Sequence, residues 1–191
     1  MNPFDLFGEC VANVDDSHIA RMELLSVDRK LFWIGPAAWG NGLIEPTGKR
    51  TFQFNPDGKP ACIVPVCRDY SFDGFEGSIS DVIAFHTDNP YRCWTLYDTE
   101  PVLNPEAVER AKPCLGADAV LQVHATPLEW LQNAREGCVI LDWSGNLRFH
   151  LGGVQRIYAA NPIFAKRLEK ALILPTWPSP EIRCAEVQNV A

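Results

Sequence analysis

The chain has 191 residues, of which 47% are hydrophobic and 21% charged, and its formal net charge is −7. This composition is typical of a folded globular protein, and the acidic balance argues against nucleic-acid binding over the whole surface. The seven cysteines include no Cys-x-x-Cys pair, and several lie in apolar runs, which favours reduced thiols and a cytoplasmic location over a disulfide scaffold. We expect neither a secretory signal nor a membrane span, because the amino terminus lacks a basic region and no apolar run approaches about 18 residues.

The amino-terminal third is predicted to contain a short helix at residues 3–13, after Asn2-Pro3. Residues 18–27 fit either a helix or the approach to a strand. Lys30–Ile34 is predicted to be a strand, ended by Gly35-Pro36. The Gly- and Pro-rich residues 35–49 are expected to form a loop.

Two hairpins are predicted next. The first covers residues 51–66 around the turn Asn55-Pro-Asp-Gly58, and Pro65 suggests that its second strand ends early or lies at an edge. The second pairs Asp81–His86 with Arg92–Tyr97. Both patterns predict an antiparallel amino-terminal part.

The carboxyl-terminal half shows alternating strand and helix patterns. Strands are predicted at residues 119–124, 138–142 and 154–159. Three helices are each predicted to begin with an N-cap followed by proline, and Thr126 forms a capping box with Glu129. The three pairs are Asn104-Pro105, Thr126-Pro127 and Asn161-Pro162.

These patterns predict an α+β or α/β fold, with a mixed sheet that has an antiparallel amino-terminal part and a β-α-β-β-α carboxyl-terminal half. Residues 1–174 are expected to form one domain, and residues 175–191 a proline-containing tail.

Two familiar kinds of site are disfavoured. Gly42–Arg50 resembles a phosphate-binding loop, but five residues separate Gly42 from Gly48 where the motif has four, and Arg50 replaces the expected Ser or Thr. A zinc site would have to combine His86 with three cysteines, and the apolar neighbours of Cys62 favour core packing instead. We therefore expect no metal and no cofactor. The three cysteines are Cys62, Cys67 and Cys93.

Three residues at predicted strand ends are candidate catalytic groups: His124, Asp142 and His86. If the strands that end at His124 and Asp142 are neighbours, the two side chains lie at one sheet edge, where a carboxylate can orient an imidazole. Ser144 is the nearest hydroxyl, but it lacks the Gly-x-Ser-x-Gly elbow. The alternative is that both histidines are partly buried residues with backbone partners and that Asp142 forms a turn.

Two segments are candidate binding surfaces. The acidic, Gly-punctuated loop at 68–80 contains Tyr70, Phe72 and Phe75, which either contact a partner or tuck under the loop. The second is a basic carboxyl-terminal face, which either contacts an anion or is a solvated surface. Its residues are Arg148, Arg156, Lys166, Arg167 and Lys170.

His124–Leu131 followed by Gly137–Trp143 resembles a group of uncharacterised proteins from proteobacterial genomes and their prophages. Asp81–His86 with Arg92–Thr95 shares the resemblance, which covers residues 80–172. It implies a bacterial or phage cytoplasmic setting, and it implies no activity and no functional residue.

The sequence therefore leaves three functions open. The leading hypothesis is a non-enzymatic accessory protein that binds another macromolecule, with a protein as the expected partner, because no catalytic signature is present and the aromatic loop and basic face resemble contact surfaces. The alternative is a small hydrolase or transferase that uses His124 and Asp142. The third is nucleic-acid contact through the basic face, which the net charge disfavours. No membrane partner is expected.

Overall fold

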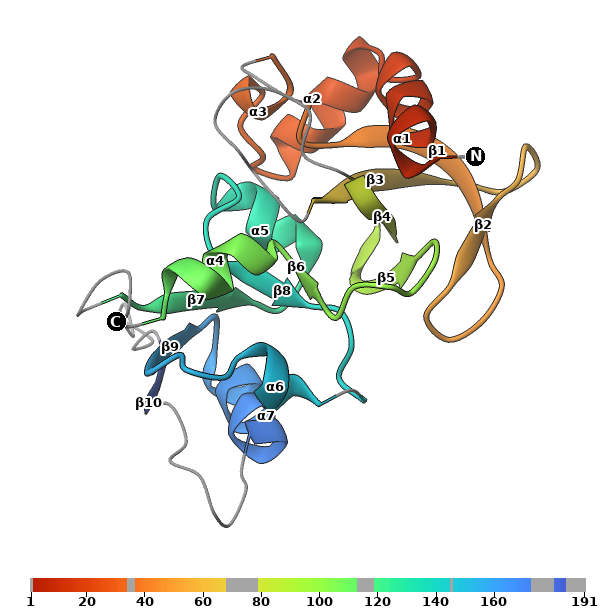
Figure 1. Ribbon diagram of the computed structural model, residues 1–191. Helices are drawn as coiled ribbons and strands as arrows, with labels where there is room; N and C mark the ends of the chain where they lie inside the picture. The colour runs from red at the N-terminus through yellow and green to blue at the C-terminus, as the bar shows by residue number, and fades with distance from the viewer. Residues whose placement is uncertain are drawn as a thin grey trace.

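The computed structural model describes residues 2–33, 37–67, 79–112, 119–144, 146–172 and 181–184. Within these residues the strands form two five-stranded sheets (Figure 1). The helices are α1 (Pro3–Ala12), α2 (Asp16–Leu24), α3 (Lys30–Trp33), α4 (Pro105–Arg110), α5 (Pro127–Gln132), α6 (Leu147–His150) and α7 (Pro162–Leu172). The strands are β1 (Gly40–Pro46), β2 (Phe52–Phe54), β3 (Lys59–Cys67), β4 (Ile79–His86), β5 (Asn89–Thr95), β6 (Val102–Leu103), β7 (Leu121–His124), β8 (Cys138–Ile140), β9 (Arg156–Ala159) and β10 (Glu181–Cys184).

The first sheet is antiparallel and has the order β2-β1-β3-β4-β5. The predicted β4–β5 hairpin is confirmed. The prediction of a hairpin at 51–66 is wrong, because β1 lies between β2 and β3 and pairs with both. The connection from β2 to β3 passes close to Ile44 of β1, where a Cβ on Gly58 would lie 2.5 Å from the Ile44 carbonyl oxygen.

The prediction of a loop at 35–49 is also wrong, since β1 occupies most of it. Glycine there serves close packing: a Cβ on Gly40 would lie 2.7 Å from the backbone carbon of Cys10, because α1 packs directly on the strand. The composition of residues 35–49 favours a loop, but in the folded protein Gly40–Pro46 forms a strand that packs on α1.

Two further predictions in this half are wrong. Lys30–Ile34 was expected to be a strand, but Lys30–Trp33 forms α3, whose first turn is fixed by the Lys30 amide donating to the Asp28 carboxylate at 2.9 Å. Pro65 neither ends β3 nor lies in an edge strand. The proline is tolerated because β1 pairs with β3 only as far as Ile63, so β1 requires no N–H from residue 65.

The second sheet has the order β10-β9-β7-β8-β6, with β6 antiparallel and the other strands parallel. From β7 the chain crosses to β8 on one side, then returns past β7 to β9 and continues to β10. The predicted fold class is confirmed, and the antiparallel and mixed parts are separate sheets. β7 and β9 are neighbours with connections that leave in opposite directions, which is the switch point of a doubly wound sheet.

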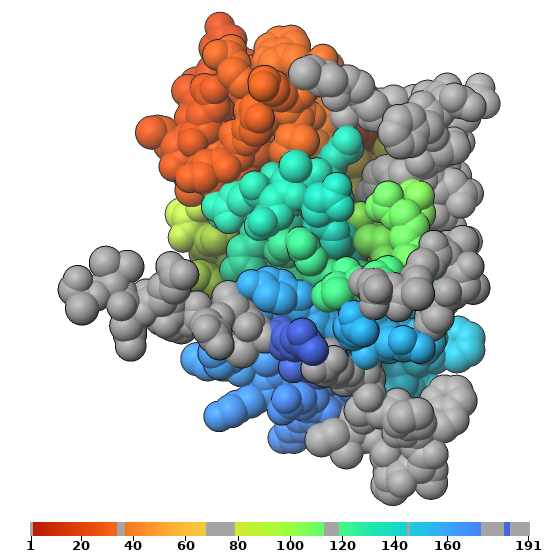
Figure 2. Space-filling model, turned by 90° about the vertical axis from the view of Figure 1, so that its left-hand side faces the viewer, coloured from red at the N-terminus to blue at the C-terminus, as the bar shows by residue number. Residues whose placement is uncertain are grey.

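Packing divides the molecule into layers. One face of the second sheet packs against α4, α6 and α7. Its opposite face, through Val139 and Leu103, shares a core with α5, α2 and the first sheet. The outer face of the first sheet packs on α1. Figure 2 shows this order from the side, from the amino-terminal helices through α5 to the α6–α7 segment.

Local capping explains where the helices of the second half begin. The Thr126 hydroxyl accepts from the Glu129 amide at 3.1 Å, and Asn161 caps α7 by accepting from the Phe164 amide at 2.9 Å. The prediction of Asn104 as a side-chain cap is wrong. Asn104 has a left-handed backbone with φ of 63°, and its amide donates to the Gly137 carbonyl at 2.8 Å instead.

A search of the described residues for a helix long and apolar enough to cross a membrane finds none.

Candidate functional site

His124 lies at the end of β7 and is only 8% exposed. Its Nε2 is 2.9 Å from the Glu136 carbonyl oxygen, so Nε2 carries a proton, since a carbonyl only accepts. Burial lowers the pKa of His124, and the weaker effects of Glu136 and Glu129 oppose that shift. The neutral imidazole with its proton on Nε2 is therefore favoured.

The Glu136 carbonyl belongs to a strained turn between α5 and β8. Ala134, Arg135 and Gly137 all have positive φ, from 53° to 73°. Besides His124, the Trp130 indole donates to the Gly137 carbonyl at 3.2 Å, as does the Asn104 amide. His124 is therefore a buried residue that hydrogen-bonds to the backbone, which is the non-catalytic alternative given above. Its hydrogen bond holds this turn against β7.

Asp142 follows β8 and makes its described contacts with different groups. Its Oδ1 accepts from the Ser144 hydroxyl at 2.7 Å and from the Ser144 amide at 2.8 Å. The same oxygen forms an ion pair with Arg50, which lies just before β2 in the first sheet. The described contacts of His124 and Asp142 therefore lead to different parts of the molecule.

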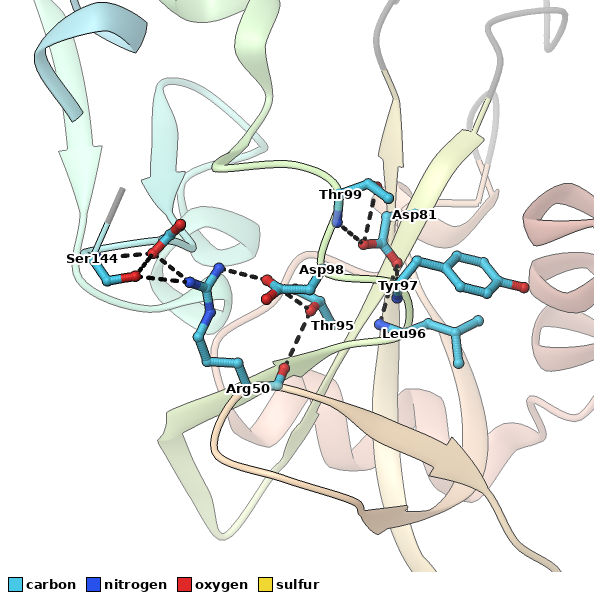
Figure 3. A network of polar contacts seen from close by, with 9 residues as sticks. Arg50, Asp81, Thr95, Leu96, Tyr97, Asp98, Thr99 and Ser144 are labelled. Atoms are coloured by element: carbon cyan, nitrogen blue, oxygen red, sulfur yellow. Dashed lines mark hydrogen bonds and ion pairs between the residues drawn. The ribbon is translucent and has the colours of Figure 1, made fainter. Parts of the chain in front are cut away.

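Arg50 connects the two sheets (Figure 3). Its guanidinium pairs with Asp142 from the second sheet and with Asp98, at 2.5 Å, from the segment after β5. Its backbone carbonyl accepts from the Thr95 amide at 2.7 Å. The Ser144 hydroxyl donates to Asp142 and accepts from the Arg50 guanidinium at 3.3 Å, so it belongs to this ion-pair network. These ion pairs link the two sheets, and we call the group of Arg50, Asp98 and Asp142 the latch.

A fully buried carboxylate, that of Asp81, organises the segment that carries Asp98. Asp81 is fully buried in β4, and it accepts from the amides of Leu96 and Tyr97 at 3.2 and 3.1 Å and from the amide of Thr99 at 3.2 Å (Figure 3). Asp98 lies inside this segment and has a φ of 56°. Asp81 thus holds the left-handed residue whose carboxylate meets Arg50.

His86 lies on the first sheet, apart from this network. Its Nδ1 is 2.8 Å from the Pro60 carbonyl oxygen, and its ring meets Trp94 edge to face at 5.3 Å between centroids. Like His124, His86 therefore hydrogen-bonds to the backbone, as in the non-catalytic alternative. His86 lines a cavity on that sheet with Trp94 and Arg92.

The basic face is concentrated on α7. Four residues spaced three or four apart point outward, and among them Ile163 is 83% exposed. The Arg167 guanidinium lies 3.7 Å from the Trp143 ring centroid, and partial burial lowers the pKa of Arg167. The four residues are Ile163, Lys166, Arg167 and Lys170; we call them the α7 face.

Two other predicted members are placed differently. Arg148 lies on α6, which packs beside α7. Arg156 lies on β9 next to Ile157, whose side chain is buried under the helices of the α7 side. Since side chains alternate along a strand, Arg156 is on the opposite face of the sheet and outside the α7 face.

The predicted loop residues Tyr70, Phe72 and Phe75 lie outside the described residues. Across the part of the chain that the structure describes, no group of three or more His, Cys, Asp or Glu side chains is arranged to hold a metal. Burial raises the pKa of the Cys10 and Cys93 thiols to about 11 and that of Cys138 to about 12, and it also raises that of Cys62. These thiols are protonated at neutral pH and unreactive.

Sequence reasoning missed Arg50, Asp81 and Asp98. Arg50 was noted only as a mismatch to a phosphate-loop motif, and no local pattern links it to Ser144, 94 residues away. For Asp81 a signal was present: an acidic residue opens an apolar strand, where a carboxylate is stable only with several donors.

No protein-family model matches this chain, and neither a curated protein nor a solved structure shows significant similarity to it.

Proposed function

We propose that this chain is a non-enzymatic accessory protein that binds an acidic, partly apolar segment of another protein through the α7 face. The observation that carries the proposal is Ile163, a large apolar side chain that is 83% exposed at the start of α7 and followed along that face by Lys166, Arg167 and Lys170. An exposed apolar side chain beside several cations is typical of contact surfaces.

The positive charges of the α7 face favour an acidic partner. The α7 face has three cations, whereas the chain as a whole has a net charge of −7. This local reversal of sign attracts an acidic partner and disfavours a second copy of the same basic face. Phe149, 79% exposed on α6, which packs beside α7, is a second exposed apolar side chain on these two helices. A protein partner with both acidic and apolar side chains complements this surface better than a polyanion does.

The catalytic alternative has weaker support. His124 is bonded to the Glu136 carbonyl and nearly buried, and Asp142 is paired with Arg50. Each of these contacts has a structural purpose that accounts for the residue.

Site-specific photo-crosslinking in the native host tests the proposal. A photoreactive residue at position 163 is compared with one at Leu24, which is 87% exposed on α2, far from α7 (Figure 1). We expect a discrete protein adduct from position 163 and none from position 24. The adduct should weaken in Lys166→Glu/Lys170→Glu and persist in the matched double variant Lys30→Glu/Lys49→Glu. Identical adducts from both positions, no adduct from position 163, or an adduct destroyed by nuclease would each contradict the proposal.

A further inference from the structure

The first sheet carries a cavity of about 430 Å³ that the proposed function does not use. It lies across β1, β3, β4 and β5, on the same sheet face as α1. Its volume is in the range of small-molecule sites. The residues used below are Ile44, Lys59, His86, Arg92 and Trp94.

The strand register shows which side chains share this face. Ile44 pairs directly with Lys59, and Trp94 pairs with Ala84, so each pair projects to one side of the sheet. Ile44, Ala84 and Trp94 all belong to the core beneath α1. Arg92, two residues before Trp94, projects to the same side, and its guanidinium carbon lies 5.0 Å from the Trp94 ring centroid.

Two cations, Lys59 and Arg92, line the cavity. Within the described part of the chain, neither Lys59 nor Arg92 forms an ion pair. Two acids also line the cavity. Glu45 accepts hydrogen bonds from Gln53 and Asn55, and its place between Ile44 and Pro46 in β1 directs its side chain to the other face. Asp57 is the second acid and lies in an exposed turn.

One buried donor at the cavity is left for a ligand. The Trp94 indole N–H is buried and has no hydrogen-bond partner, and Trp94 is only 4% exposed beneath Arg92. An unpaired buried N–H is unfavourable, so a ligand oxygen that accepts from it is bound more tightly. His86 Nδ1 donates to the Pro60 carbonyl, which makes Nε2 of the neutral ring an acceptor, so His86 borders the cavity without binding an oxyanion.

We propose that this cavity binds a small organic anion, a carboxylate or phosphate monoester on a flat apolar body. Arg92 and Lys59 bind the oxyanion, and Ile44 contacts the apolar part. The Trp94 ring orients the Arg92 guanidinium by stacking, and the indole N–H donates to a second oxygen of the anion. This site is independent of the α7 face, because it lies on the other sheet.

Titration followed by the Trp94 indole N–H resonance tests the site in the full chain, with the resonance assigned from the spectrum of Trp94→Phe. The probes are benzoate, phenyl phosphate and the neutral benzyl alcohol. We expect saturable movement with at least one of the two anions, with a dissociation constant below about 1 mM, and none with benzyl alcohol. A response to benzoate alone assigns a carboxylate, and a response to phenyl phosphate alone assigns a phosphate.

Two variants complete the test. Arg92→Gln removes an exposed cation without disturbing the core, and it should weaken binding by about tenfold. Arg148→Gln, on α6, should leave binding unchanged. The proposal is overturned if the resonance does not move saturably up to about 10 mM of either anion, if benzyl alcohol moves it equally, or if Arg92→Gln binds as well as the natural chain.

Discussion

Replacing Asp81 with asparagine tests whether one buried carboxylate organises the segment after β5. Its Oδ1 accepts from the amides of Val82, Leu96 and Tyr97 at 2.8 to 3.2 Å, and its Oδ2 accepts from the Thr99 amide and hydroxyl at 3.2 and 3.3 Å. Asparagine has nearly the same shape and retains one oxygen. Its amide nitrogen replaces the oxygen that faces Thr99.

The magnitude follows from this geometry. The new NH₂ group faces the Thr99 amide, so two donors oppose one another and one buried N–H loses its partner, which costs about 1–3 kcal/mol. The three remaining bonds to Oδ1 lose their charge-assisted character. We expect Asp81→Asn to lower the free energy of unfolding by about 2–4 kcal/mol, a large share of the 5–15 kcal/mol typical of a domain.

Urea unfolding followed by tryptophan fluorescence measures this change, and hydrogen exchange localises it. The amides of Leu96, Tyr97 and Thr99 should exchange faster in the variant, because their common acceptor is weakened. Glu45→Gln is the matched control: its exposed carboxylate also accepts from two side-chain amides, and we expect a change below about 0.5 kcal/mol. A loss below about 1 kcal/mol in Asp81→Asn, or unchanged exchange at the three amides, would refute the reasoning.

Three further predictions concern the packing, the latch and the titration of the fold. Gly40→Ala should destabilise by about 1–3 kcal/mol in urea unfolding, because its Cβ meets the Cys10 backbone, whereas Gly8→Ala, with open space in α1, should stabilise by about 0.5–1 kcal/mol; equal effects would contradict this account. Arg50→Met should lower stability by about 1 kcal/mol in low salt and by less in 1 M salt (about a 3 Å Debye length), and a loss independent of salt would show that the ion pairs contribute nothing. The lowered pKa of His124 means that the unfolded chain takes up the proton first, so its contribution is fully present above the ordinary value of 6.5 and declines as pH falls below it; urea unfolding between about pH 5 and 8 should show a shallower decline in His124→Gln, and identical profiles would exclude this role.

Much of the second half could be predicted because its signals are local. Thr126 and Asn161 cap helices within their own turns, and the apolar runs that became β7, β8 and β9 are short and bounded. The contacts of the candidate site were harder to predict from the sequence. The prediction that His124 lies at a strand end is confirmed. Its hydrogen bond to the Glu136 carbonyl, however, depends on a turn with three positive φ values, which no sequence pattern predicts.

Local sequence patterns predict the starts of α5 and α7, the strands β7, β8 and β9, and the basic stripe on α7, because each depends on residues within a few positions of one another. Three outcomes depend on the assembled fold: Gly40 begins a strand, β1 lies between β2 and β3, and Arg50 pairs with both Asp98 and Asp142. Those outcomes require contacts between residues tens of positions apart, such as the 94 between Arg50 and Ser144. The energy of such contacts comes from burial and charge pairing in the assembled fold, so it cannot be derived from local propensity.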